Sequence, residues 1–158
     1  MKYKDLSHED FDAIVTGELT HYALWFESEI INIITDYFLR SSPKRSDFER
    51  LLLLRDGLTF QDKIEIVRAM IPLFGKEAST VNLKSLLKQV EDFKSWRNAV
   101  AHGVDASDDD TKPELKVEVV SRSGKQKIVH ITPESHQAKM AEAEKLFSEL
   151  VAARKGLR

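Results

Sequence analysis

The chain has 158 residues, a formal net charge of −2 at pH 7 and no cysteine. The lack of cysteine excludes disulfides and thiolate metal sites. The near-neutral charge argues against a protein that coats long duplex DNA, because such binding depends on many phosphate contacts. No apolar run is long enough to span a membrane, and the N-terminus lacks the apolar core of a signal peptide. We therefore expect a single cytoplasmic domain over residues 1–158.

The first long helix is predicted between Ser7 and Ser41. Ser7 and Asp10 form a capping box before it, and Ser41-Ser42-Pro43 ends it. Its apolar residues follow steps of three and four, and three more apolar side chains widen the stripe. The stripe consists of Phe11, Val15, Leu19, Tyr22, Phe26, Ile30, Ile33 and Tyr37, with Trp25, Ile34 and Phe38 beside them. Such a pattern is typical of a helix that is central to a core.

Three further helices are predicted between Pro43 and Gly103, each beginning at a side chain suited to cap a first turn. The cap residues and their partners are Ser46 with Glu49, Thr59 with Asp62, and Asn82 alone. The helix that follows Thr59 is predicted to end at Pro72 and Gly75, since both residues interrupt helical geometry.

The pattern changes after Gly103. Two segments around residues 115–119 and 127–131 alternate between apolar and polar side chains, with Ser123-Gly124 between them, which predicts a β-hairpin at about residues 114–132. Pro133 is favourable in a first helical turn and indicates a last helix at about residues 133–155. The expected fold is mainly α, an up-and-down bundle of four to five helices with one β-hairpin inserted before the last helix.

The fourth helix carries a charged residue on its apolar face. At about 100° per residue, Arg97 falls on one side of the helix together with apolar residues. These residues are Leu83, Leu86, Val90, Phe93 and Val100. Asn98 and His102 lie on the polar face instead. Burying an unpaired charge is costly, so we expect Arg97 to reach an acid, a cleft or a subunit interface, with Glu29 or Glu18 as the acidic partner.

Arg97 and His102 together suit metal-free phosphate chemistry. Arginine is a permanent cation with a planar fork of donors, and histidine exchanges a proton near neutral pH. The residues alone leave a second interpretation open, in which Arg97 forms an ordinary ion pair and His102 is a favourable cation at a helix C-terminus. The two side chains diverge by roughly 140° on an ideal helix. A shared site therefore needs a helix break near Ala101–Gly103 or a second copy of the chain.

The end of this helix resembles the HEPN family, whose hallmark is an arginine, four to six further residues and a histidine. The matching residues are Arg97-Asn98-Ala99-Val100-Ala101-His102-Gly103. The segment Leu58-Thr59-Phe60-Gln61-Asp62-Lys63-Ile64 also resembles one that many bacterial members carry. The similarity covers roughly Asp10 to Gly103. It implies a dimeric helical bundle whose site lies between the protomers, with Arg97 and His102 as the catalytic pair and Asn98 as the supporting residue.

The family resemblance also implies a function. Many members are metal-independent RNA endonucleases that serve as toxins, in phage defence or in RNA processing. We therefore expect a homodimer that cleaves single-stranded RNA by 2′-hydroxyl attack to a 2′,3′-cyclic phosphate, with no cofactor or metal, and with a cognate antitoxin as a further partner. The alternatives are an inactive HEPN-like module that binds nucleotides or regulates a partner, and a plain helical adaptor. The Asp108–Asp110 run is expected to be a solvated loop rather than a magnesium site.

Overall fold

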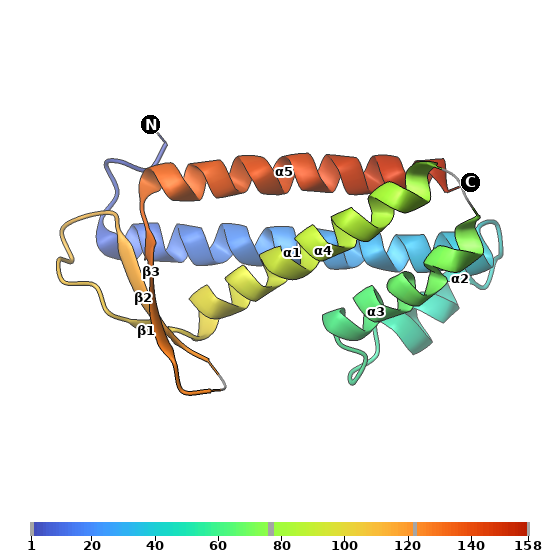
Figure 1. Cartoon of the computed structure of the whole chain (residues 1–158), viewed down its shortest axis with the longest axis horizontal. Coiled ribbons are helices and arrows are strands. Elements are labelled where there is room, and N and C mark those ends of the chain that lie inside the picture. Colours follow the sequence, from blue (N-terminus) through green and yellow to red (C-terminus); the bar gives the residue numbers. More distant parts are fainter. Residues whose placement is uncertain (1, 76–77, 122, 158) are drawn as a thin grey trace. The chain divides into compact units, whose positions relative to one another are not determined.

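The computed structural model describes residues 2–75, 78–121 and 123–157, with only the backbone described over 78–81. The chain is mainly helical and carries a small antiparallel sheet (Figure 1). Its elements in order are α1 (His8–Leu39), α2 (Arg45–Phe48), the π-helical turn η1 (Glu49–Leu53), α3 (Phe60–Met70), the 3₁₀ turn η2 (Ile71–Phe74), α4 (Ala78–His102), β1 (Val104–Asp105), β2 (Leu115–Val120), β3 (Gln126–Ile131) and α5 (Pro133–Gly156). The predicted helical class and the hairpin before the last helix are confirmed.

The chain packs as two compact units, and α1, α4 and α5 supply residues to both. The first unit comprises Met1–Ala23 and Phe93–Glu144 and includes the sheet. The second unit comprises Leu24–Asp92 and Lys145–Arg158 and includes α2 and α3. Each unit has buried apolar residues of its own, so each is described by itself.

Two of the predicted helix caps are confirmed. The Ser7 hydroxyl accepts a hydrogen bond from the backbone N–H of Asp10 at 3.1 Å and donates to its carboxylate at 2.8 Å. Thr59 and Asp62 form a reciprocal capping box at the start of α3. Both caps satisfy N–H groups that lack partners in the first turn. The sequence signal is local in each case, and the helix begins where that signal predicts.

The other two predicted caps are wrong. Helix α2 begins at Arg45, one residue before Ser46, after a Lys44 that makes no side-chain cap. Helix α4 begins at Ala78, four residues before Asn82. Gly75 has a left-handed φ of 82° that turns the chain ahead of α4, so the helix is already under way at Asn82.

The three strands of the first unit form one sheet in the order β1-β2-β3 (Figure 1). Strands β2 and β3 pair antiparallel, with Leu115 opposite Ile131. Their buried side chains alternate, because successive residues of a strand face opposite sides of the sheet. These side chains are Leu115, Val117, Val129 and Ile131. Strand β1 was not predicted. It has two residues, too few to carry a periodic pattern, and pairs with β2.

Gly103 lies where a side chain has no room, directly after α4. A Cβ built at Gly103 would lie 2.0 Å from the Cγ1 of Val117 and 2.8 Å from the carbonyl oxygen of Ala99. Gly103→Ala is therefore expected to lower the free energy of unfolding by about 1–3 kcal/mol, the usual cost of overpacking. Gly17 in α1 is the matched control, because its Cβ would meet nothing within 4 Å.

Gly17→Ala is expected to raise the free energy of unfolding by about 0.5–1 kcal/mol, since alanine favours a helix interior. Urea denaturation of both variants measures the contrast. Equal effects of the two substitutions would contradict the close packing of Gly103 against β2.

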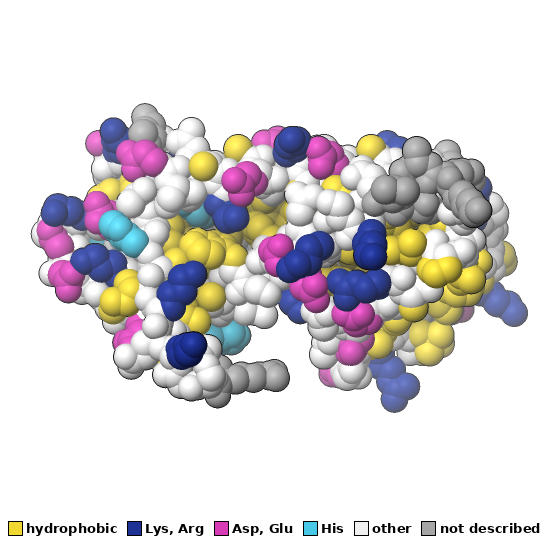
Figure 2. Space-filling view, viewed as in Figure 1, with side chains coloured by type: hydrophobic (Ala, Val, Ile, Leu, Met, Phe, Trp, Pro, Cys, Tyr) yellow, Lys and Arg dark blue, Asp and Glu magenta, His cyan; other side chains and the backbone are white. Residues whose placement is uncertain are grey.

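The buried stripe of α1 is shorter in the second unit than predicted. Phe26, Ile30 and Ile33 are buried as expected. Tyr37 and Phe38, which the spacing places on the stripe, are 44% and 55% exposed. The rings that meet these two side chains belong to short segments: the Tyr37 ring meets Phe74 of η2, and Phe38 meets Phe48 of α2. Hydrophobic side chains accordingly remain at the surface near α2 and α3 (Figure 2).

Candidate functional site

The residues of the HEPN-like motif lie at the end of α4, in the first unit. The helix is unbroken through His102, and the N–H of Gly103 still donates to the carbonyl of Ala99 at 2.9 Å. The break that would turn Arg97 and His102 toward each other is therefore absent. On a continuous helix their side chains leave the axis about 140° apart. One chain alone does not direct both groups at one phosphate.

Arg97 is half-buried at the edge of the apolar face of α4, between the buried Phe93 and Val100. Its Nη1 donates to the side-chain oxygen of Asn98 at 3.1 Å. Its Nε is buried and has no hydrogen-bond partner among the described residues. An unmet buried donor costs about 1–3 kcal/mol, so a group that supplied an acceptor would be favoured there. The Arg97 guanidinium thus forms a hydrogen bond to Asn98 through Nη1, whereas its Nε forms none with the described residues.

Asn98 and His102 are exposed on the polar face of α4, as the sequence predicts. Trp96, between these two faces, is half-buried, and the Nζ of Lys139 lies 5.6 Å from the centre of its ring. This distance is typical of a cation–π contact. Lys139 therefore covers part of the ring surface that a stacked base would otherwise use.

The acidic partners expected for Arg97 bind other groups. Within the first unit, one carboxylate oxygen of Glu18 accepts from the hydroxyl of Tyr3 and bonds the Nε2 of His136, each at 2.8 Å. The other oxygen accepts from Lys2 at 2.9 Å. Glu18 thus ties the N-terminal segment to α5. The expected ion pair between Glu18 and Arg97 is therefore wrong.

The buried His136 predicts a pH-dependent stability. Burial lowers the pKa of His136 below its usual 6.5, although the hydrogen bond with Glu18 opposes this. Between the lowered pKa of His136 in the folded protein and its usual 6.5, the unfolded chain therefore binds more protons at this residue than the folded one. The free energy of unfolding is expected to fall as the pH drops below 6.5. Urea denaturation at a series of pH values measures the slope.

His136→Gln tests the assignment, because glutamine donates a hydrogen bond but does not titrate. The variant is expected to show a flatter dependence than the unsubstituted protein below pH 6.5. His8 acts in the opposite direction: burial lowers its pKa, but bonds to the Glu114 carbonyl and to Asp105 outweigh this and raise it. An unchanged slope in His136→Gln would rule out His136 as the titrating group.

Glu29 belongs to a charged cluster in the second unit, here called the Arg154 network: Glu29, Asp36, Arg45 and Arg154. The Nε of Arg154 donates to Glu29, and its Nη1 donates to Asp36 at 2.7 Å. Arg45 donates to the other oxygen of Asp36 at 2.6 Å. Glu29 is 4% exposed, so its charge is balanced by Arg154 and not by the predicted Arg97. The two acids lie seven residues apart on α1, a spacing that places them on one helix face.

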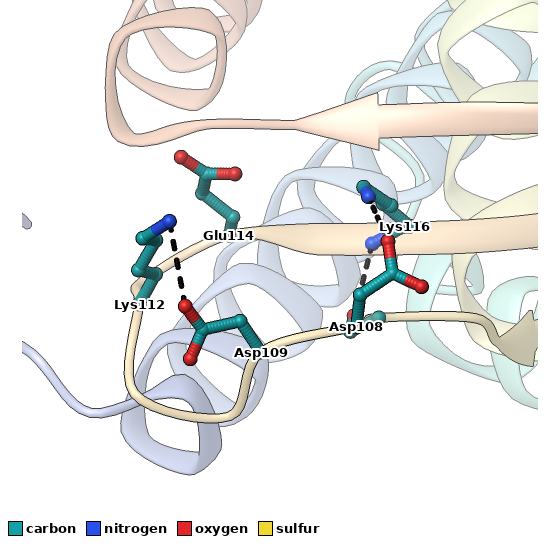
Figure 3. A pocket seen from close by; sticks show the side chains of 6 residues that line it. Asp108, Asp109, Lys112, Glu114 and Lys116 are labelled. Carbon is teal, nitrogen blue, oxygen red and sulfur yellow. Dashed lines mark hydrogen bonds and ion pairs between the residues drawn. The ribbon is translucent and has the colours of Figure 1, made fainter.

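The acidic loop between β1 and β2 lines a hollow of about 250 Å³ (Figure 3). Its carboxylates face lysines: Lys112 lies 3.3 Å from Asp109, and Lys116 binds Asp108. No group of three histidines or carboxylates in the described part of the chain is arranged to hold a metal ion. The loop charges therefore satisfy one another across the hollow.

A second hollow, here called the α4-end cavity, lies beside the HEPN-like motif and has a volume of about 200 Å³. Four elements of the first unit and the glycine after α4 build it. Its lining residues are Asp12 and Thr16 of α1, Val100 and Ala101 of α4, Gly103, Asp105 of β1, and Leu115 and Val117 of β2. The sequence did not predict this cavity, because its walls come from segments that are distant along the chain.

Comparisons with protein-family models, with curated proteins and with solved structures find no match to this chain. Within the described ranges, no helix combines the length and the apolar composition that crossing a bilayer requires.

Proposed function

We propose that this protein is a HEPN-like, metal-independent endoribonuclease that acts as a homodimer, with Arg97 and His102 as its catalytic residues. The observation that carries the proposal is the Arg97 guanidinium, half-buried at the end of α4, which donates to Asn98 and makes no ion pair within the described residues. A phosphate oxygen is a suitable acceptor for such a group. The exposed imidazole of His102 follows on the same helix.

The proposed reaction is an attack by a ribose 2′-hydroxyl on the adjacent phosphorus. His102 accepts the hydroxyl proton or returns a proton to the leaving 5′ oxygen, and an imidazole is suited to both roles near neutral pH. Arg97 binds the nonbridging oxygens and stabilises the charge that develops on them. Asn98, which accepts from Arg97, orients the guanidinium. The products are a 2′,3′-cyclic phosphate and a 5′-hydroxyl.

The second copy follows from the helix geometry. Because α4 continues unbroken to His102, Arg97 and His102 of one chain point to different sides of the helix. In the isologous pair that we propose, each Arg97 lies near the His102 of the partner chain, and the twofold axis makes the two contacts equivalent. In this arrangement the dimer has two sites, and each site takes one residue from each chain.

The test is cleavage of a single-stranded RNA in the presence of EDTA. Arg97→Ala and His102→Ala are each expected to lower the cleavage rate by about 10²–10⁴-fold. Arg50→Ala and His130→Ala are the matched controls, because both side chains are exposed and belong to elements other than α4. Loss of activity in EDTA, or full activity in both α4 variants, would refute the proposal. A substrate with deoxyribose at the cleaved position should remain intact.

The α4-end cavity favours a second candidate function, a HEPN-like module that binds nucleotides without cleaving them. Its lining combines apolar side chains with polar groups that could orient a ligand. The two functions differ in one result: the module would bind nucleotides and leave RNA intact. Overexpression gives a cellular test of a toxin role, in which growth arrest relieved by His102→Ala supports the nuclease.

A further inference from the structure

The α4-end cavity combines buried apolar side chains with polar ones, as the binding of a base with polar edges requires. Val100, Leu115 and Val117 line it and are buried. Asp12, Thr16 and Asp105 supply the polar groups of its lining. Ala101 and Gly103, which also line it, flank His102 in the sequence. A ligand in this cavity therefore lies next to the end of α4 that carries the proposed catalytic residues.

The charges of the cavity select for hydrogen-bond donors. Asp105 is already engaged: one carboxylate oxygen accepts from the backbone N–H of Ser107 at 2.9 Å, and the other lies 3.2 Å from the Nε2 of His8. Asp12 makes no ion pair within the described residues, and its one hydrogen bond is a long one of 3.4 Å from the Thr16 hydroxyl. Two carboxylates repel a phosphate group, so the cavity suits the neutral base of a nucleotide and not its phosphate. Asp12 is thus the group available to a ligand that presents N–H donors.

We infer that the α4-end cavity binds an unpaired guanine base of the RNA, with the Asp12 carboxylate accepting from guanine N1–H and from its 2-amino group. This inference rests on the proposed function, because it assigns the substrate of the same site. Single-stranded RNA exposes base edges to such recognition. A carboxylate accepts two parallel donors, and guanine presents two adjacent donors on its pairing edge. Adenine and cytosine present one donor group there, and uracil places a carbonyl on each side of its single N–H.

The first experiment measures binding without cleavage, by calorimetric titration with guanosine 3′-monophosphate and uridine 3′-monophosphate. The unsubstituted protein should bind the guanosine nucleotide at least tenfold more tightly. Asp12→Asn should remove about tenfold of that preference, the expected effect of losing a charged hydrogen bond. Glu9→Gln is the matched control, since Glu9 is an exposed acid of the same helix that lies outside the cavity.

Ala101→Phe is the second variant, because its ring would fill the cavity from an exposed position. It should weaken guanosine 3′-monophosphate binding at least tenfold, with the fold of each variant checked by circular dichroism. Equal binding of the two nucleotides by the unsubstituted protein would overturn the inference. So would an unchanged preference in Asp12→Asn.

The second experiment separates this inference from the proposed nuclease. Cleavage sites are mapped on an RNA that contains all four bases in every context. If the unsubstituted protein cleaves beside guanine and Asp12→Asn loses this preference, the result supports both proposals. Cuts without base preference leave the nuclease and overturn the guanine site. Guanosine binding that depends on Asp12, with no cleavage by the unsubstituted protein, supports the guanine site and refutes the nuclease.

Discussion

Replacing Glu29 by alanine is expected to lower the free energy of unfolding by about 3 kcal/mol. Glu29 is 4% exposed and bonded to Arg154. Removing one partner of a buried ion pair leaves an uncompensated charge and costs about 3–5 kcal/mol. The low end of that range applies, because Arg154 keeps its bond to Asp36 at 2.7 Å. Urea denaturation followed by circular dichroism measures the change.

Lys88→Ala is the matched control, because it breaks an ion pair on the surface. Lys88 and Asp92 are both more than 60% exposed at their side chains, and such a pair contributes about 0.3–0.5 kcal/mol. A double-mutant cycle of Glu29→Ala and Arg154→Ala should be clearly non-additive, since residues in contact share their interaction free energy. Equal losses in Glu29→Ala and Lys88→Ala would show that the Arg154 network does not stabilise the fold.

The elements that the sequence predicts correctly have their determinants close together along the chain. The capping box of Thr59 and Asp62 lies within one helical turn. The alternation from Leu115 to Ile131 and the turn at Gly124, which has a positive φ of 77°, specify the hairpin. Local hydrogen bonds and side-chain periodicity therefore predict these elements with their approximate limits.

The predictions that fail depend on contacts between distant segments. Periodicity places Tyr37 and Phe38 on the buried stripe, but burial needs a neighbouring element that covers them. The rings that meet these two side chains come from short segments and leave both partly exposed. The partner of Glu29 lies 125 residues away in α5, and no local signal distinguishes Arg154 from Arg97 as that partner. The spacing of side chains along the sequence predicts which helix face they occupy, whereas tertiary packing determines which residues contact that face.

The same distinction holds for the candidate site. The faces of Asn98 and His102 follow from helical periodicity, and the structure exposes both side chains. The α4-end cavity could not be predicted, because Asp12 meets the end of α4 and strand β2 only in the folded chain. The unsatisfied Nε of Arg97 is also a product of packing. The sequence thus predicts the chemistry of the motif, and the fold adds the hollow beside it.

Mixing Arg97→Ala chains with His102→Ala chains is expected to restore RNA cleavage that neither variant has alone. In the proposed dimer each site takes its arginine from one chain and its histidine from the other. A mixed dimer then has one site with both residues and one site with neither. Random re-association makes about half of the dimers mixed, so the expected activity is about one quarter of that of the unsubstituted protein.

A site built within a single chain gives a different result. Every site of a mixed dimer would then lack one of the two residues, and mixing would restore nothing. The experiment needs chains that exchange, which mass spectrometry of isotopically labelled dimers measures directly. Because α4 is continuous from Ala78 to His102, the two side chains of one chain diverge by about 140°, and the proposed site therefore needs a second chain. Exchange without recovered cleavage would therefore contradict the shared site and the dimeric nuclease together.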